Sequence, residues 1–242
     1  MTLVMADIHL GIEVELSQFG LHLPDQTQKI LNRILGYILE RNPDRVVLLG
    51  DIKHNIPQVT RVEEKGILAL IEQISKHTQV EIIPGNHDGR IRDLLPDTPN
   101  VTLHGTGGAV IDGVGYFHGH AWPSEEVLEA EHLIMGHNHP VIQFKDTFGY
   151  TIHERVWIRA KCEFSVLKDH YPSLQSWKDP CCMIMPAFNE LCGGITFNAG
   201  HEEDLLGPMT SRVLRIDEAE VYLLDGTFIG RIGDVKGDHD VE

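Results

Sequence analysis

The sequence has no long apolar run, few cysteines and few basic residues. No stretch approaches the roughly eighteen apolar residues that a membrane-spanning helix needs. The N-terminus lacks the basic segment followed by an apolar run that marks a signal peptide. Four cysteines are too few for a disulfide scaffold, and without C-x-x-C spacing they indicate no zinc site. We therefore expect a cytoplasmic protein with buried free thiols and no membrane partner.

The shortage of basic residues bears on which substrates the chain can bind. Lys and Arg total 20 against 36 Asp and Glu, which gives a net charge of −16. Proteins that bind nucleic acid non-specifically usually present a basic surface. A nucleic-acid substrate would therefore need a basic partner or a local basic rim. Six residues near the motifs described below are candidates for such a rim: Lys53, Arg90, Arg92, Lys145, Arg155 and Arg159.

Strands and helices are predicted to alternate through residue 139. Short apolar runs that predict buried strands lie at 3–6, 46–49, 80–84 and 133–136. Asp25 with Gln28 resembles a capping box that opens a helix ending at Asn42-Pro43, and Thr60 with Glu63 repeats that signal. This alternation predicts parallel strands joined by helical crossovers in an α/β fold.

Beyond residue 140 the helical pattern fades and short β-prone runs predict antiparallel strands. These runs are 141–144, 150–158, 162–167, 194–197, 213–216, 221–224 and 228–232. Asp225-Gly226 predicts a hairpin turn, and 168–180 is predicted to be a loop. We expect a single domain over residues 1–232 and a polar, disordered tail at 233–242.

Five short motifs supply candidate metal ligands. They are Asp7-Ile8-His9, Gly50-Asp51, Gly85-Asn86-His87-Asp88, Gly119-His120 and Gly136-His137-Asn138-His139. Each alone says little, because Gly-Asp usually marks a turn and a chain with 15 histidines produces accidental near-matches. Together they supply carboxylates, an amide oxygen and several imidazoles, close to the set that holds two divalent ions. Such a pair of ions clamps a phosphate ester and activates a water.

The positions of the motifs fit a shared site. Most of them follow an apolar run directly, so we expect them at the carboxyl ends of strands, where sites in such sheets lie. Asp7 and His9 are two residues apart and point the same way from an extended segment, and so do His137 and His139. Asp51 has two carboxylate oxygens and is a natural bridge between two ions.

The motif set resembles that of the calcineurin-like metallophosphoesterase superfamily, D-x-H, G-D, G-N-H-[DE], G-H and G-H-x-H, over residues 3–139. The segments 6–13, 50–54 and 186–194 are similar to the Icc-like group, which includes DNA-ligase-associated phosphoesterases. The opening motif resembles, more distantly, the exonuclease subunit of double-strand-break repair. Protein phosphatases of the superfamily carry an Asp-Arg-Gly after the G-D motif. This chain has Ile52-Lys53-His54 there, which counts against a phosphoprotein phosphatase.

The resemblance implies a fold and a set of metal ligands. The fold is a two-sheet αββα sandwich with mixed sheets and an antiparallel C-terminal portion. The implied ligands are Asp7, His9 and His139 for a first ion, Asn86, His120 and His137 for a second, and Asp51 for both. The fourth motif offers both His118 and His120, and the Gly-His order favours His120.

Three further residues have implied or suggested roles near the substrate. The resemblance implies that His87 faces the scissile phosphate, where it stabilises charge or protonates the leaving oxygen. Asp88 would orient His87 through a ring-nitrogen hydrogen bond. His54, three residues after Asp51, is either a substrate contact that overhangs the site or a solvated loop histidine.

These features predict a two-metal phosphoesterase that hydrolyses phosphodiesters in DNA or RNA through a metal-activated water. The mixed His, Asn and Asp ligands favour Mn²⁺, with Fe, Zn, Ni and Mg as alternatives. The alternative function is a phosphodiesterase or phosphomonoesterase that acts on a small nucleotide or cyclic nucleotide. A non-catalytic binding module is disfavoured, because the ligand set is complete. The expected partners are a nucleic acid or nucleotide and a DNA-repair helicase or ligase.

Overall fold

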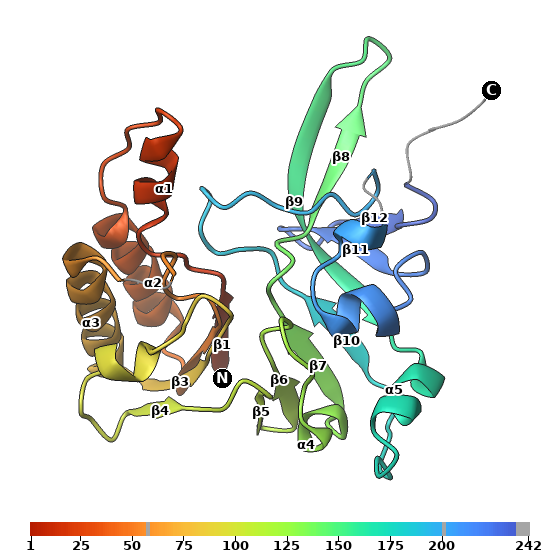
Figure 1. Cartoon of the computed structure of the whole chain (residues 1–242), viewed down its shortest axis with the longest axis horizontal. Helices are drawn as coiled ribbons and strands as arrows, with labels where there is room; N and C mark the ends of the chain where they lie inside the picture. Colours follow the sequence, from red (N-terminus) through yellow and green to blue (C-terminus); the bar gives the residue numbers. More distant parts are fainter. Residues whose placement is uncertain (57–58, 200–201, 236–242) are drawn as a thin grey trace. The chain divides into compact units, whose positions relative to one another are not determined.

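The computed structural model describes residues 1–56, 59–199 and 202–235, which divide into two compact units. The first unit holds Met1–Thr106 and Phe188–Cys192, and the second holds Gly107–Ala187 and the chain from Gly193 onward. Figure 1 labels their helices and strands. Within the predicted tail, residues 236–242 lie outside the described residues. Val235 still belongs to a turn, in which its N–H bonds to the Arg231 carbonyl at 3.0 Å.

The first unit contains a four-stranded sheet with the order β1-β2-β3-β4, and every pairing in it is parallel. Its strands are β1 Thr2–Ala6, β2 Arg45–Leu49, β3 Gln79–Ile83 and β4 Val101–Leu103. The register pairs Ala6 with Leu49 and Leu49 with Ile83, so the first three strands end level with one another. That shared edge brings together the segments that follow these strands.

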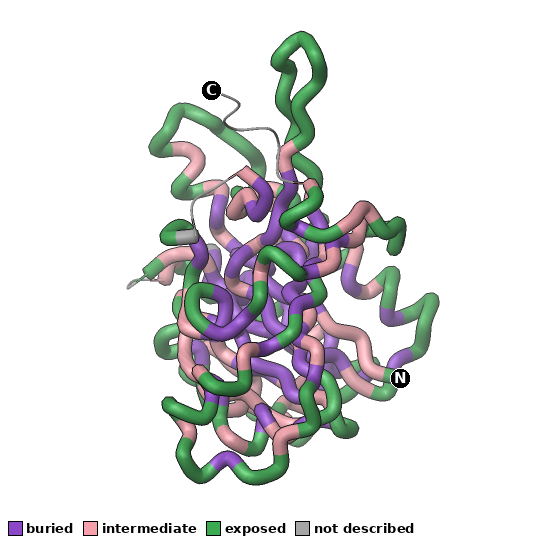
Figure 2. Tube along the Cα trace, turned by 90° about the vertical axis from the view of Figure 1, so that its right-hand side faces the viewer, coloured by how far each residue is buried: buried purple, intermediate pink, exposed green. Residues whose placement is uncertain are grey.

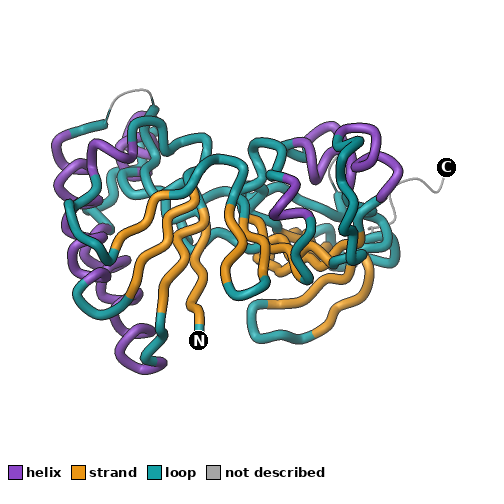
Figure 3. The backbone as a smooth tube through the Cα atoms, turned by 90° about the horizontal axis from the view of Figure 1, so that it is seen from below, coloured by secondary structure: helices purple, strands orange, loops and turns teal. Residues whose placement is uncertain are grey.

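Helices of the first unit connect the parallel strands, and Figure 3 shows them on one side of the sheet. They are α1 Ile12–Gln18, α2 Thr27–Arg41, α3 Arg61–Ser75 and the 3₁₀-helix η1 Ile91–Leu94. The capping box predicted from Thr60 and Glu63 is confirmed at the start of α3. The one predicted from Asp25 and Gln28 is wrong, because α2 has no side-chain cap and Asp25 instead accepts the Thr27 N–H at 2.7 Å.

The core of the first unit lies between these helices and the sheet. Alternate residues of β2 and β3, such as Val46, Leu48 and Ile82, pack with the apolar stripes of α2 and α3, including Ile34 and Ile71. All five are 0 % exposed. Strands buried on both faces read as continuous apolar runs, and for this reason the sequence located them well. Figure 2 marks the buried residues in purple.

The second unit contains a mixed sheet of eight strands with the order β12-β11-β9-β10-β7-β6-β5, with β8 paired to β9. The strands are β5 Ala109–Ile111, β6 Val114–Tyr116, β7 His132–Met135, β8 Val141–Lys145, β9 Thr151–Lys161, β10 Cys181–Ile184, β11 Glu220–Leu223 and β12 Phe228–Arg231. The β6-β7 and β7-β10 pairs are parallel, and the others are antiparallel. The predicted α/β class with two sheets and an antiparallel C-terminal portion is confirmed. The first sheet, however, is parallel throughout.

Helical elements of the second unit correct parts of the strand prediction. They are α4 Glu125–Leu128, α5 Phe164–His170, the 3₁₀-helix η2 Glu202–Asp204 and the π-helix η3 Met209–Val213. The strand predicted at 162–167 is wrong, because the Glu163 side chain accepts the Ser165 N–H and starts α5. The runs 194–197 and 213–216 each contribute an isolated bridge, through Thr196 and Leu214, rather than a full strand.

The turn prediction at Asp225-Gly226 is confirmed by the antiparallel pair β11 and β12. Asp225 accepts the Thr227 N–H at 2.9 Å, and this side-chain bond stabilises the turn. Among the described residues, no helix is long and apolar enough to cross a membrane.

Candidate metal centre

The candidate residues of the first unit follow three parallel strands at their carboxyl ends. Asp7 and His9 come after β1, Asp51 comes after β2, and the loop that holds Asn86, His87 and Asp88 comes after β3. Because these strands end level, the sheet brings the three segments to one edge. The predicted location of these motifs at strand ends is therefore observed.

The backbone at several candidate ligands adopts a left-handed conformation that residues other than glycine rarely take. In the first unit Asp7 has φ 58°, His9 has φ 44° and Asp51 has φ 50°. In the second unit His137 has φ 73° and His139 has φ 43°. Left-handed residues cost about 1–3 kcal/mol each and cluster at functional sites, where the surrounding structure holds them. Five of the seven predicted metal ligands lie in this conformation.

Asp7, His9 and Asp51 form a buried cluster. Their exposed fractions are 0 %, 4 % and 2 %, and one ligand atom of each lies within 4.8 Å of the other two. Nε2 of His9 lies 3.6 Å from Oδ2 of Asp51. Burying two carboxylates together is costly without compensating positive charge. Carboxylate oxygens with an imidazole nitrogen are ligands that divalent ions such as Mn²⁺ and Zn²⁺ accept, so this donor set fits a metal.

Two more imidazoles, those of His54 and His87, lie beside His9 of this cluster. The His9 ring centroid lies 4.9 Å from that of His87 and 5.1 Å from that of His54, and the His54 and His87 rings stack at 5.5 Å. Nδ1 of His54 lies 3.1 Å from Nδ1 of His9. One of these two nitrogens must carry a hydrogen and the other must accept it. The structure therefore places His54 next to a candidate ligand.

Hydrogen bonds hold the His87 loop against the loop after β2. The His87 N–H donates to Oδ1 of Asp51 at 2.8 Å, and Nδ1 of His87 contacts the His54 carbonyl. Asp88 accepts the Ile52 N–H at 2.9 Å and the Gly85 N–H at 2.8 Å. The Asp88 carboxylate thus ties the two loops together through their backbones. This differs from the expected role of Asp88 as a ring partner of His87.

Gly85 is required by a close approach to Asp51. A Cβ atom at Gly85 would lie 2.1 Å from Oδ1 of Asp51 and 2.5 Å from its backbone nitrogen. No side chain fits in this space. The glycine therefore lets the loop after β3 pack directly on the candidate bridging carboxylate. Asn86, the next residue along this loop, is exposed.

Lys53 is fully buried, which corrects its predicted place in a basic rim. Its Nζ donates to the Asn55 carbonyl at 2.9 Å. Burial lowers the pKa of the Lys53 ammonium, and the nearby carboxylates of Asp88, Glu63 and Asp51 offset part of this effect. Buried in this way, Lys53 compensates the carboxylates of the loops rather than contacting a phosphate in solvent.

Ion pairs engage two more members of the proposed rim. Arg90 pairs with Asp93 at 2.9 Å, and Arg159 pairs with Glu220 at 2.8 Å. Arg155 is half-buried and donates to the Ala187 carbonyl at 3.1 Å, whereas Arg92 and Lys145 are exposed. Burial therefore withdraws Lys53 from the proposed rim, and carboxylate partners offset the charge of the exposed Arg90 and Arg159.

Candidate residues of the second unit follow β6 and β7, which are parallel. His118 is fully buried, and its ring centroid lies 5.3 Å from that of His120 and 5.0 Å from that of His137. The rings of His120 and His137 lie 6.2 Å apart. Both His118 and His120 therefore accompany His137, and the choice between them stays open. β6 ends at Tyr116, two residues before His118.

His139 has a backbone partner for one ring nitrogen. Its Nδ1 lies 2.9 Å from the Gly193 carbonyl oxygen. A carbonyl only accepts hydrogen bonds, so Nδ1 carries the hydrogen and Nε2 is left as the nitrogen that can bind a metal. This arrangement is common for metal-binding histidines.

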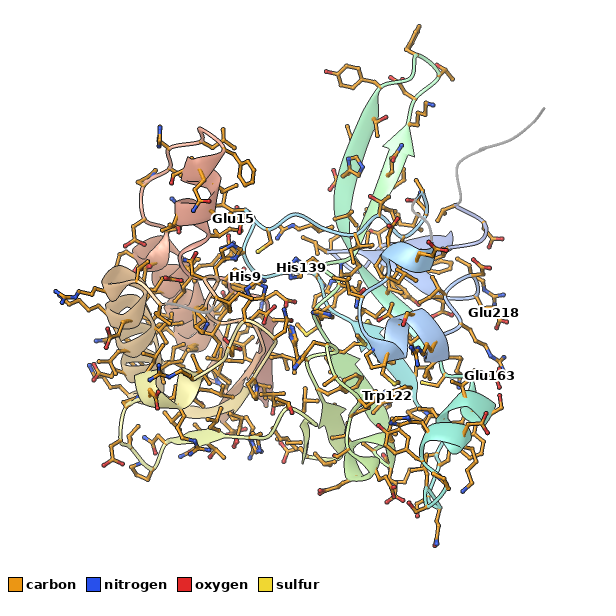
Figure 4. All side chains as sticks on the ribbon, in the orientation of Figure 1. His9, Glu15, Trp122, His139, Glu163 and Glu218 are labelled. Atoms are coloured by element: carbon orange, nitrogen blue, oxygen red, sulfur yellow. The ribbon has the colours of Figure 1, made fainter. Side chains whose placement is uncertain are left out.

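Glu15 was not singled out from the sequence, yet it contacts the site of the first unit. Its Oε2 lies 2.5 Å from Nε2 of His54. Figure 4 labels Glu15, which comes from α1, and His9. No motif marks Glu15, because its partner lies 39 residues away along the chain. Glu13, on the same helix, instead accepts the Gln26 N–H at 2.7 Å and so connects α1 to the start of α2.

None of the four cysteines takes part in a disulfide, as predicted. Cys162 and Cys182 are buried, whereas Cys181 and Cys192 are only half-buried. Burial raises the pKa of the Cys162 thiol to about 12 and that of Cys182 well above its usual value. The two buried thiols are therefore protonated and unreactive at neutral pH.

The fold of this chain is similar to that of a solved structure. The nuclease MPE of Pseudomonas putida matches with a TM-score of 0.52 and 17 % identity, covering 92 % of this chain and 84 % of that one. YfcE, a phosphoesterase from E. coli, matches with a TM-score of 0.45 and 13 % identity, covering 95 % and 97 %. No curated protein matches.

A family model decides the assignment. The model of the calcineurin-like phosphoesterases matches residues 1–192, which contain all five motifs. The predicted enzyme class is confirmed by this match. The chain belongs to the calcineurin-like phosphoesterase family and is a metal-dependent hydrolase of phosphate esters.

Proposed function

We propose that the protein hydrolyses phosphodiester bonds in DNA or RNA. The observation that carries this proposal is the group at the strand ends of the first unit, where buried Asp7, His9 and Asp51 adjoin His54 and His87. The preference for nucleic acid rests on the resemblance to the Icc-like and DNA-ligase-associated phosphoesterases. The His54 loop also lacks the arginine motif of the phosphoprotein phosphatases.

The ligand assignment is proposed from the family motifs. Asp51 serves both ions, and the remaining ligands are Asp7, His9 and His139 for one ion and Asn86, His120 and His137 for the other. Mn²⁺ is the proposed metal, because mixed nitrogen and oxygen ligands suit borderline ions. When bound, two such ions neutralise phosphate charge and provide a nucleophilic water.

His87 is the proposed catalytic residue. The hydrogen bond between its N–H and Asp51 fixes the loop, and the His54 carbonyl orients the ring through Nδ1. The opposite nitrogen, Nε2, is then the atom that can face a phosphate, and it can give a proton to the leaving oxygen when the ring is in its doubly protonated imidazolium form. Asp88 keeps the loop in place through its backbone hydrogen bonds.

His54 is proposed to contact the substrate. Glu15 holds its Nε2, and His9 lies against its Nδ1. The ring is therefore fixed on both sides, next to His87. Because both ring nitrogens are engaged, His54 would meet a bound ester through the exposed part of its ring, or through Nε2 once a phosphate replaces Glu15 there. A small nucleotide would meet the same groups, so it remains the second candidate substrate.

A substrate panel tests the proposal. Metal-stripped protein reconstituted with Mn²⁺ is assayed on bis-p-nitrophenyl phosphate, p-nitrophenyl phosphate, cyclic nucleotides, and single-stranded DNA and RNA. We expect diester cleavage to exceed monoester cleavage and the oligonucleotides to be cut. Dominant monoester activity with intact oligonucleotides would reject the nuclease proposal and favour the small-molecule function. Protein without added metal is the control for contaminating nucleases.

The finer assignments rest on resemblance alone. Membership of the Icc-like group and a DNA-repair helicase or ligase as partner are proposals of this kind. A basic partner would supply the positive charge that this acidic chain lacks. The cytoplasmic location stays a prediction of the sequence.

A further inference from the structure

Asn138 stands between the candidate ligands His137 and His139 in the sequence. It is 0 % exposed, and its side chain binds a segment far along the chain. Its Oδ1 accepts the Leu206 N–H at 2.9 Å. Its Nδ2 donates to the Leu206 carbonyl at 3.1 Å and to Oγ1 of Thr210 at 3.0 Å. A buried amide that makes three hydrogen bonds fixes both of the segments it joins.

The same segment also touches the other histidine motif of the second unit. Gly207 has φ 78°, and a Cβ atom there would lie 2.1 Å from the Gly119 carbonyl oxygen and 3.4 Å from Cδ2 of His137. The segment therefore packs on the backbone next to His120 as well as on the ring of His137. Only glycine allows this approach.

A second stretch of the C-terminal chain supports the backbone after β7. The Ile195 N–H donates to the Asn138 carbonyl at 3.3 Å, and the Val141 N–H donates to the Ile195 carbonyl at 3.0 Å. Gly193 provides the carbonyl partner of His139 Nδ1. All of these partners lie beyond residue 192, where the family match ends.

From these contacts we propose that Asn138 and residues 205–210 form a clamp that holds the histidine motifs of the second unit in their metal-binding form. His137 and His139 flank Asn138 and both have left-handed backbones, which persist only where surrounding contacts hold them. Asn138 supplies those contacts, and the π-helix η3 carries Thr210. π-Helical turns are often found at functional sites.

The clamp gives Asn138 a positioning role that its place in the motif does not reveal. The side chain does not act as a ligand, because its amide oxygen and nitrogen are already engaged by Leu206 and Thr210. Its effect on catalysis passes through the orientation of the neighbouring imidazoles. This inference rests on the proposed function, since it takes the histidines to be metal ligands.

The first test changes Thr210, which belongs to neither motif. Thr210→Val removes the hydroxyl acceptor at nearly constant shape, and Thr210→Ser keeps it. Mn²⁺ affinity of the metal-free protein is measured by titration calorimetry. We expect Thr210→Val to weaken Mn²⁺ binding about tenfold, the lower end for residues that support metal ligands, and Thr210→Ser to bind within about twofold of wild type. Equal affinities for all three proteins would overturn the clamp.

The second test compares two buried asparagines of the second unit. Asn198 also makes three side-chain hydrogen bonds, to the Gln143 N–H and carbonyl and to the Val235 carbonyl, and these partners lie outside the histidine motifs. Asn138→Ala and Asn198→Ala should lower the melting temperature of the metal-free protein by similar amounts. Only Asn138→Ala should weaken Mn²⁺ binding and lower kcat on bis-p-nitrophenyl phosphate.

The outcomes separate the clamp from the proposed function. If wild-type protein binds no Mn²⁺, the proposed two-metal function fails. If wild type binds two ions and Asn138→Ala binds them as tightly as Asn198→Ala does, only the clamp fails. Should Asn138→Ala not fold, the Thr210 pair decides alone, because Thr210→Val keeps the shape of the side chain and Thr210→Ser removes only one methyl group.

Discussion

The backbone N–H of His87 donates a 2.8 Å hydrogen bond to Oδ1 of Asp51. This bond connects the proposed catalytic residue to the proposed bridging ligand through the main chain rather than through the imidazole. The His87 ring can therefore be removed without changing what Asp51 accepts. Metal binding and proton transfer should then be separable by substitution.

His87→Ala should retain both metal ions and lose roughly two or more orders of magnitude in turnover, the size expected for a general acid or charge-stabilising group. Asp51→Asn keeps an oxygen for the His87 N–H but removes the charge shared by both ions. This variant should lose occupancy at both sites. Metal content per chain and turnover of bis-p-nitrophenyl phosphate are measured on the purified variants. A His87→Ala protein that holds one ion fewer would contradict the assigned role.

Glu15→Gln should weaken the hydrogen bond to Nε2 of His54 while keeping a side chain of the same length. Because the carboxylate contacts Nε2 of His54 from α1, we expect kcat/KM on oligonucleotides to fall roughly tenfold, as for residues that orient functional groups. Metal content should not change. Glu13→Gln is the matched control, because Glu13 lies on the same helix and contacts the Gln26 N–H instead. Equal losses for both variants would indicate a general effect on α1.

The sequence predicted the strand ends of the first unit well. Strands buried on both faces are continuous apolar runs, so the residues that follow them, such as Asp7 and Asp51, could be located without a structure. The capping box at Thr60 was also visible, because both of its residues lie within one turn of helix. Local signals of this kind depend on neighbours in the sequence.

Features that depend on distant residues could not be predicted. Lys53 appeared to be a surface cation, but the fold buries it among carboxylates from three segments. The partners of Asn138 lie 68 and 72 residues away, so nothing in the motif Gly-His-Asn-His marks its asparagine as part of the clamp. The run 162–167 has a β-prone composition, but Glu163 caps a helix there. Tertiary context decided each of these cases.

The cysteines should differ sharply in reactivity. Iodoacetamide reacts with the thiolate, so at pH 8 the half-buried Cys181 and Cys192 should be labelled in the native protein. Cys162 and Cys182 should be labelled only after unfolding, because burial raises the pKa of both thiols. Fragment mass spectrometry distinguishes the adjacent Cys181 and Cys182. Fast labelling of Cys162 in native protein would contradict its burial.

The raised pKa of Cys162 also sets a direction for stability at alkaline pH. The folded protein favours the neutral thiol, with a pKa of about 12, whereas the unfolded chain ionises near the ordinary value. The unfolded state is therefore favoured as pH rises through this window, and the free energy of unfolding should fall between about pH 9 and 12. Urea unfolding at several pH values measures this fall. Cys162→Ala should show a smaller fall than wild type.

Binding of nucleic acid by the isolated chain should be weak and only mildly dependent on salt. The net charge is −16, Lys53 is buried, and Arg90 and Arg159 are paired with carboxylates. With two or three phosphate contacts, from groups such as Arg92 and Lys145, the slope of log K against log salt should be roughly −1.4 to −2.1 for single strands. A basic partner should increase both the affinity and the slope.

This prediction is measured with His87→Ala protein, which binds without cutting, on single-stranded oligonucleotides in Mn²⁺ across a range of salt concentrations. Arg92→Ala should reduce the slope by about 0.7, the share of one phosphate contact. Arg90→Ala is the matched control on the same short segment, and its effect should be smaller because Asp93 already pairs with that charge. Tight binding with a steep slope would reveal a basic groove that the composition conceals. If no binding is detected at low salt while wild-type protein hydrolyses small nucleotides, the small-molecule function is favoured, because a polyanion repelled by this surface cannot be the substrate of the isolated chain.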